Sequence, residues 1–183
     1  GTKIDLGTFE VPPAIRELDV KPSEPAFDAK GQTIYRTVER KEQLVASIRV
    51  KIPAKDLSTQ LAILLPEVMT HLHGIGAAQA GPPFTRYHSM DEKWIDLEAG
   101  IPVKAKIQEK GRVKNSSLPK GKTINCWHVG PYHGLGAAHQ ALDKHLQQQR
   151  LSPRGGAWEI YWTDPGMVPD PSKWRTQLFA PIR

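Results

Sequence analysis

The stretch Gly81-Pro82-Pro83-Phe84-Thr85-Arg86-Tyr87, which leads to Gly100-Ile101-Pro102-Val103, decides the fold, because the chain repeats its context once. Residues 44–103 read as a strand, a helix and two further strands, and residues 123–182 follow the same order. The two segments align at Val45 with Ile124, at Pro102 with Pro181 and, after compensating changes in loop length, at Tyr87 with Tyr161. The repetition predicts two β-α-β-β units packed about a pseudo-twofold axis. The seam between such units is a favoured place for a small-molecule pocket.

The predicted fold class is α+β, with duplicated β-α-β-β units forming one antiparallel sheet, both helices on one face and a central ligand pocket. The first helix ends at Gly74, and Pro66 within its apolar stripe predicts a kink or a restart. The second helix is predicted over residues 134–149, with one apolar and one polar face. Ahead of the first helix, residues 33–38 and 44–52 are predicted to pair as a hairpin. The face without helices is left to bind a ligand or to be capped by loops.

The N-terminal segment differs from the rest of the chain. Residues 1–31 contain four prolines that interrupt any regular pattern, which predicts an extended arm. Residues 32–183 are predicted to form one domain, with units at about 32–103 and 104–183. The total of 183 residues is the length of a single domain, so the two units can share one core.

Composition and charge limit the partners. A net charge of +6 raises nucleic acid as a possibility, but the basic residues of 104–122 lie among glycines and serines that are typical of a solvated hairpin or connector. Without a helix-turn-helix or RNA-binding signature, direct nucleic-acid binding is not expected. No apolar run approaches the roughly 20 residues that span a bilayer, so no membrane partner is expected. The single Cys126 excludes an internal disulfide, and we expect a cytoplasmic location.

No cofactor or metal is predicted. The seven histidines do not show the converging spacing that a zinc site requires, and none is marked as an axial ligand for haem.

The segment Trp158-Glu159-Ile160-Tyr161-Trp162 contains the strongest candidate site. Side chains alternate along a strand, so Glu159 and Tyr161 point to one face, and Thr85 and Tyr87 occupy the equivalent positions in the first unit. A carboxylate among aromatic rings suits a flat, apolar and often cationic ligand. The alternative is an ordinary exposed strand residue with packing tyrosines.

Four spaced motifs resemble those of the GyrI-like family of small-molecule-binding domains, which includes effector-binding domains of transcription regulators. The motifs are Gly81–His88, Asp96–Val103, Gly130-Pro131-Tyr132, and Trp158–Tyr161 with the terminal Arg175-Thr176 and Ala180-Pro181-Ile182. The resemblance implies that Glu159 is the acidic partner of the ligand, that Tyr161 and Tyr87 hydrogen-bond it, and that Trp127 and Tyr132 form aromatic walls. The DNA-binding domain of the regulators is not found in this sequence.

Two further residues are candidates for the ligand pocket. Glu98 shares a strand face with Asp96 and could add a second carboxylate, or it could be an exposed edge charge. Trp94 could form a lid over the seam or simply cover the core.

These observations predict a stand-alone protein that captures apolar aromatic or cationic ligands between its two repeats, as a sensor, a sequestering protein or a detoxifying factor. Since some relatives are hydrolases, the first alternative is a hydrolase of electrophilic cyclopropane compounds, with Glu159 as general base assisted by Tyr161. The second alternative is a protein-interaction module that contacts a topoisomerase or a regulator.

Overall fold

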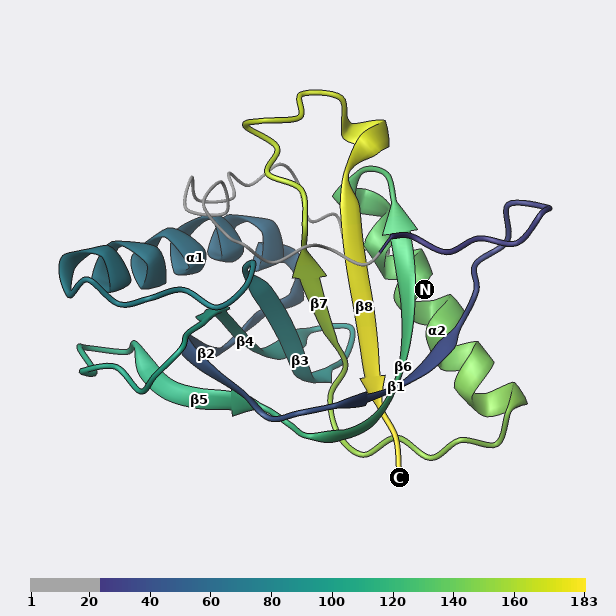
Figure 1. Ribbon diagram of the computed structural model, residues 1–183, viewed down its shortest axis with the longest axis horizontal. Coiled ribbons are helices and arrows are strands. Elements are labelled where there is room, and N and C mark those ends of the chain that lie inside the picture. Colours follow the sequence, from purple (N-terminus) through teal and green to yellow (C-terminus); the bar gives the residue numbers. More distant parts are fainter. Residues whose placement is uncertain (1–23) are drawn as a thin grey trace.

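The computed structural model describes residues 24–183, which form one curled sheet with two long helices (Figure 1). The strands are β1 (Arg36–Arg40), β2 (Gln43–Pro53), β3 (Phe84–Met90), β4 (Trp94–Pro102), β5 (Lys114–Leu118), β6 (Gly121–Val129), β7 (Trp158–Tyr161) and β8 (Arg175–Pro181). The helices are α1 (Leu57–Gly74) and α2 (Leu135–Gln148), with the 3-10 turns η2 (Ala54–Asp56), η3 (Tyr132–Gly134) and η4 (Pro171–Lys173). Most of the arm predicted at residues 1–31 lies outside the described residues.

Neither long helix of residues 24–183 has the length and apolar character needed to cross a lipid bilayer.

The strand order within residues 24–183 is β1-β6-β8-β7-β3-β4-β2-β5, and every neighbouring pair is antiparallel. This order has an internal twofold symmetry. If β1, β2, β3 and β4 are exchanged with β5, β6, β7 and β8 respectively, the same order is obtained by reading the sheet from its other edge. At the centre β3 pairs with β7, and Thr85 lies directly opposite Glu159. The predicted antiparallel α+β architecture is confirmed, and Glu159 lies at the junction of its two halves.

The outermost strands are exchanged between the halves. β1 precedes β2 in the chain but pairs with β6, whereas β5 precedes β6 but pairs with β2. The hairpin predicted from residues 33–38 and 44–52 is therefore wrong. Part of the segment 104–122, predicted as a hairpin or connector, forms β5 and pairs with β2. A β1–β2 hairpin would have left the edge of β6 without a partner, and unpaired edges are costly.

Both helices lie on the same face of the sheet, on either side of β3 and β7 (Figure 1). α1 buries seven apolar side chains and α2 buries Leu135, Leu142 and Leu146, all at helical spacing. α1 runs through Pro66 as one helix. Pro66 is exposed, so the carbonyl that loses its N–H partner four residues earlier lies on the solvent side, where water can bond to it.

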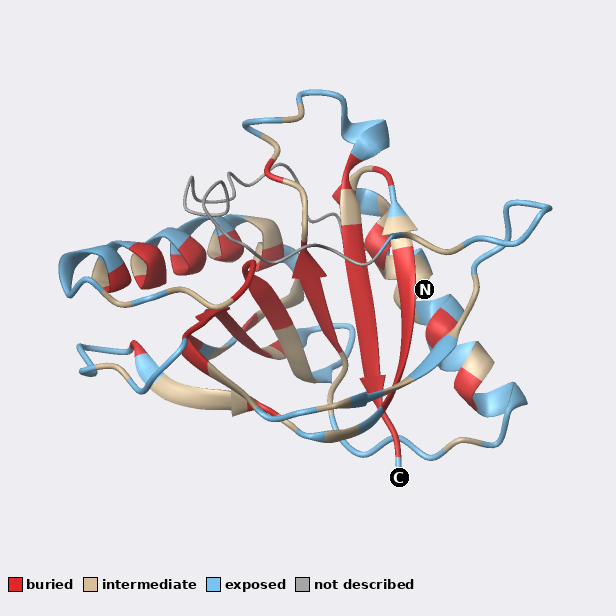
Figure 2. Cartoon of the chain, viewed as in Figure 1, coloured by how far each residue is buried: buried red, intermediate tan, exposed pale blue. Residues whose placement is uncertain are grey.

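The face without helices has a smaller core of its own, in which Trp158, Phe84 and Phe179 are fully or almost fully buried. The central strands are consequently buried on both faces (Figure 2). The alternation predicted for β7 is confirmed, since Tyr161 joins the core under the helices and Trp158 joins the opposite one. Glu159 thus faces the helices, not the helix-free face that the sequence analysis left open for a ligand.

Candidate ligand-binding site

The candidate site is centred on the carboxylate of Glu159, which is 0% exposed. Cross-strand pairing places Glu159 beside Thr85, and strand alternation places Tyr87 and Tyr161 on the same face. The central pairing of β3 with β7 therefore brings together residues that lie more than seventy positions apart.

Two tyrosines donate hydrogen bonds to the same oxygen of this carboxylate. The hydroxyls of Tyr87 and Tyr161 both donate to Glu159 Oε1, the second at 2.9 Å. Thr85 Oγ1 lies 2.8 Å from the Tyr161 hydroxyl and can donate to it in turn. This chain of hydroxyls stabilises a buried negative charge without a fixed cation.

His139 on α2 is the third partner, and it was not among the site residues predicted from the sequence. Its Nε2 donates to Glu159 Oε2 at 3.2 Å, and its ring meets the Tyr87 ring edge-on at 5.5 Å between centroids. The side chain is 21% exposed, whereas that of Glu159 is 0% exposed. His139 therefore lies between the carboxylate and solvent. The sequence contained one indication that His139 faces the core. Its position is four residues after Leu135 and three before Leu142, so it lies on the apolar stripe of the helix.

Tyr132 adds a further aromatic ring from η3. Its ring packs edge-on against Tyr161 at 5.6 Å between centroids, and it lies 4.8 Å from the Trp174 ring at a tilt of 37°. Trp174 is held in turn by a hydrogen bond from its Nε1 to the carbonyl oxygen of Val168, at 2.7 Å. Trp174 thus anchors the loop after β7 and supports one wall of the candidate site.

The environment of Glu159 suppresses ionisation of its tyrosine neighbours. Burial raises the pKa of Tyr87 and Tyr161 well above the ordinary value of 10.0, and the charge of Glu159 adds to both effects. Burial, followed by the charges of Glu159 and Asp164, also raises the pKa of Tyr132. These hydroxyls consequently remain neutral hydrogen-bond donors throughout the physiological pH range.

Alkaline titration is expected to show delayed tyrosine ionisation. All four tyrosines, including Tyr35, have a raised pKa, so the native state holds protons that the unfolded state releases near pH 10. Their stabilising contribution is complete below that pH and is lost as the pH rises through the folded-state values. As the pH is raised, the absorbance of tyrosinate should therefore increase over the same pH range in which circular dichroism shows the protein unfolding. Ionisation of all four tyrosines near pH 10 in a still-folded protein would contradict this assignment.

The other predicted site residues lie elsewhere. Trp127 is buried on the helix-free face, where its ring lies 6.4 Å from that of Trp162. Trp94 is 45% exposed at the start of β4, and the ammonium of Lys51 lies 5.8 Å from its ring centroid. Of the predicted set, Glu159, Tyr161, Tyr87 and Tyr132 are brought together, whereas Trp127, Trp94 and Glu98 are not.

Glu98 is buried, but on the face opposite to Glu159. Its neighbour Ala99 pairs with Thr85, so alternation turns Glu98 away from the helices. Ser47 Oγ donates to it at 2.6 Å and His88 Nε2 at 3.0 Å. Burial alone would raise the pKa of Glu98, but the hydrogen bonds from Ser47, Ser116 and His88 outweigh burial and lower it. Glu98 therefore has its own polar neighbours and does not add a second carboxylate to the candidate site.

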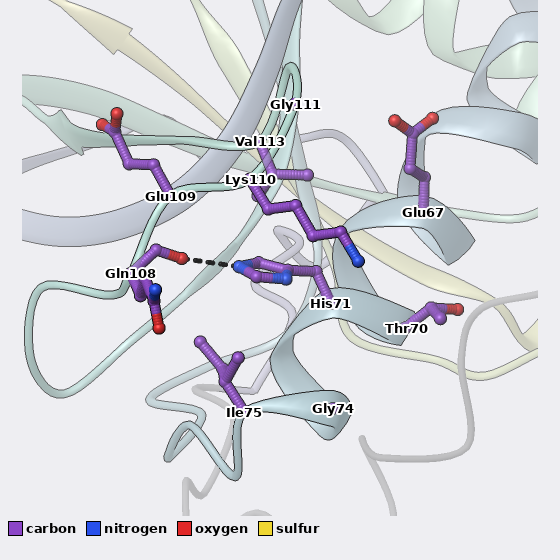
Figure 3. Close-up of a pocket in the computed structure, with 10 residues that line it drawn as sticks. All are labelled: Glu67, Thr70, His71, Gly74, Ile75, Gln108, Glu109, Lys110, Gly111 and Val113. Atoms are coloured by element: carbon purple, nitrogen blue, oxygen red, sulfur yellow. Dashed lines mark hydrogen bonds between the residues drawn. The ribbon is translucent and has the colours of Figure 1, made fainter.

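A cavity of about 730 Å³ lies between the second half of α1 and residues 108–113 (Figure 3). His71 projects into it and donates from Nε2 to the carbonyl oxygen of Gln108 at 2.6 Å. None of the predicted site residues lines this cavity. Within residues 24–183, no cluster of three or more histidine, cysteine or acidic side chains could hold a metal ion.

Comparison with known structures supports the fold. EcmrR in its complex with DNA superposes with a TM-score of 0.75 at 22% identity, over 82% of this chain and 57% of EcmrR. The C-terminal domain of EcmrR alone gives 0.73 at 22% identity, over 83% of this chain and 97% of that domain. SAV2435 bound to tetraphenylphosphonium gives 0.53 at 11% identity, over 82% and 94%. A hydrolase from Listeria innocua gives 0.56 at 15% identity, over 81% and 91%.

The chain thus spans less than two thirds of EcmrR but nearly all of its C-terminal domain. A sequence comparison with curated proteins gave no significant match. The family profile described as the GyrI-like small molecule binding domain matches residues 34–183, which is most of the chain. The resemblance seen in the sequence motifs is confirmed, and the chain belongs to the GyrI-like family of small-molecule-binding domains.

Proposed function

We propose that this domain binds a flat, apolar organic cation beside Glu159 and serves as a sensor or a sequestering protein. The observation on which the proposal depends is a fully buried carboxylate that has hydroxyl and imidazole partners but no lysine or arginine within ion-pair distance among residues 24–183. A buried carboxylate is costly unless it is paired, so the charge of a bound cation would stabilise it.

The surroundings favour an aromatic cation over a small hydrated one. Tyr87, Tyr161 and Tyr132 place three rings around the carboxylate, and ring faces attract cations most strongly when water is excluded. The structural neighbour SAV2435 was solved with tetraphenylphosphonium, a cation surrounded by four rings. Tetraphenylphosphonium is tetrahedral and not flat, but it shares with the proposed ligand a single positive charge and aromatic rings.

Access to Glu159 would be through His139. This imidazole is the partly exposed partner of the carboxylate, and the Tyr87 ring beside it is only half-buried. A cation that reaches Glu159 would replace the hydrogen bond from His139 and lie between the helix and β3. We therefore expect the α2 side of the site to adjust on binding.

The proposal predicts that charge decides ligand choice. The flat cation 1-methylquinolinium should bind at least about tenfold more tightly than its neutral isostere 1-methylnaphthalene, because the two differ mainly in the ion pair with a buried carboxylate. Isothermal titration calorimetry with both compounds measures the difference. Equal affinities, or no detectable binding of the cation, would refute the proposal.

The alternative function is that of a hydrolase, and the contact between His139 and Glu159 favours it. Glu159 bonded to an imidazole could accept a proton from water during attack on a strained electrophile. The Listeria innocua neighbour is described as a hydrolase. Incubation with an excess of an electrophilic cyclopropane compound separates the two functions, because many turnovers per protein indicate an enzyme and stoichiometric capture indicates a binder.

A further inference from the structure

A second cavity, of about 350 Å³, opens on the helix-free face of the sheet, near β1, β6 and β8. It is separated from Glu159 by the sheet itself, because Gln177 and Phe179 line it while Leu178 between them faces the helices. The volume is within the range of small-molecule sites. Whatever this cavity binds would therefore bind independently of Glu159.

Aromatic rings form the walls of this cavity. The rings of Trp127 and Trp162 lie 6.4 Å apart between centroids, tilted by 36°, and Phe179 lines the same space. Trp127 is almost fully buried, and Trp162 is fixed by a hydrogen bond from its Nε1 to Gln177 Oε1 at 3.0 Å. Two fixed indoles and a phenyl ring offer stacking surfaces for a planar molecule.

Apart from Glu24, the polar side chains that line the cavity can donate hydrogen bonds. The guanidinium carbon of Arg40 lies 4.4 Å from the centroid of the Phe179 ring, and no carboxylate of residues 24–183 pairs with it. Gln177 uses its oxygen for Trp162, so its amide N–H groups remain available. The side chain of Asn125, only 7% exposed as a residue, has no hydrogen bond within the described part of the chain.

The charge balance of the cavity is positive. Arg36 and Arg40 both line it, while its acid, Glu24, pairs with Arg175 at 3.2 Å. Burial lowers the pKa of Arg40, and no carboxylate of residues 24–183 lies within ion-pair distance to offset the lost hydration of its guanidinium. A bound anion would supply that compensation.

We propose that this cavity is a second ligand site, which binds a planar aromatic carboxylate with its rings against Trp127 and Trp162 and its carboxylate on Arg40. Gln177 and Asn125 would donate further hydrogen bonds to the anion. The domain would then bind a cation on one face of the sheet and an anion on the other.

The test uses 2-naphthoate and its neutral isostere 2-naphthamide, measured by calorimetry and by quenching of tryptophan emission. The naphthoate should bind and the amide should bind about tenfold more weakly, since a hydrogen-bonded charge contributes on the order of a factor of ten. Arg40→Met, which keeps an apolar stem, should weaken naphthoate binding by a similar factor. Glu159→Gln, on the opposite face, should leave it unchanged.

Arg36→Gln provides a second variant, because Arg36 is exposed and its loss does not disturb the core. It should weaken naphthoate binding by about threefold and reduce the dependence of binding on salt. The inference is overturned if naphthoate does not bind the wild-type protein, if the amide binds equally well, or if both arginine variants retain wild-type affinity. A gain in naphthoate affinity in Glu159→Gln, which removes a like charge, would place the anion at the first site and would overturn it as well.

Discussion

Replacing Glu159 by glutamine is expected to weaken 1-methylquinolinium binding by roughly 100-fold, because removing one partner of a buried charge pair costs on the order of 2–5 kcal/mol. Glutamine keeps the shape of the side chain, and its amide oxygen can still accept from Tyr87 and Tyr161. The loss should therefore reflect charge and not a collapsed site. Calorimetry measures it, and the affinity for 1-methylnaphthalene should be almost the same in both proteins.

Glu98→Gln is the matched control. Glu98 is the other buried strand glutamate, but it lies on the opposite face and is bonded to Ser47 and His88. This variant should bind the cation as the wild type does. If Glu159→Gln binds within about twofold of the wild type, or if Glu98→Gln shows the larger loss, the cation is not bound by Glu159. In the hydrolase alternative, Glu159→Gln would stop turnover of the cyclopropane compound.

Gly156→Ala is expected to destabilise the fold by about 3 kcal/mol or more, at the upper end of what overpacking costs. An alanine Cβ at this position would lie 1.9 Å from the carbonyl oxygen of Tyr87 and 2.7 Å from its carbonyl carbon. The adjacent Ala157 accepts a hydrogen bond from the Tyr87 N–H at 2.9 Å, so relief requires β3 and β7 to part at the centre of the sheet. The same movement would displace Tyr87 from Glu159.

Denaturant unfolding followed by tryptophan emission measures this effect, and Gly74→Ala is its control. Gly74 ends α1, and an added Cβ there meets nothing within 4 Å, so alanine should leave stability unchanged or raise it by up to about 1 kcal/mol. A Gly156→Ala protein that unfolds within 1 kcal/mol of the wild type would show that β3 and β7 do not restrict this position as tightly as the structure indicates.

Local patterns in the sequence were sufficient to predict much of the fold. The alternation of Trp158, Glu159 and Tyr161 correctly separated the two faces of β7, and the apolar spacing of α2 gave its limits to within a residue. These features depend on neighbours a few positions apart, which a single chain displays directly. Pairing between distant strands is not displayed in this way, and the exchange of β1 and β5 was missed for that reason.

The candidate site could be predicted only in part, because a single sequence does not show how distant strands pair. Glu159, Tyr161 and Tyr87 were predicted together because Glu159 and Tyr161 alternate onto one face of a strand and Tyr87 occupies the position equivalent to Tyr161 in the first unit. Alternation within one strand cannot say how its faces match those of another strand, and in the structure Trp127 and Glu98 both lie on the face opposite to Glu159. His139 was considered only as a metal ligand, although a polar residue within an apolar helical stripe indicates a buried polar partner.

The reciprocal placement of β1 and β5 has a consequence for cooperativity. β3 and β7 join the halves through three residue pairs, whereas β1 and β5 add a further five pairs each at the outer edges. Each half depends on the other for its outermost strand, so a fragment containing one half alone would lack part of its own sheet. We expect the domain to melt as a single unit, and we expect ligands to enter by local rearrangement around α2 instead of by hinge-like separation of the halves.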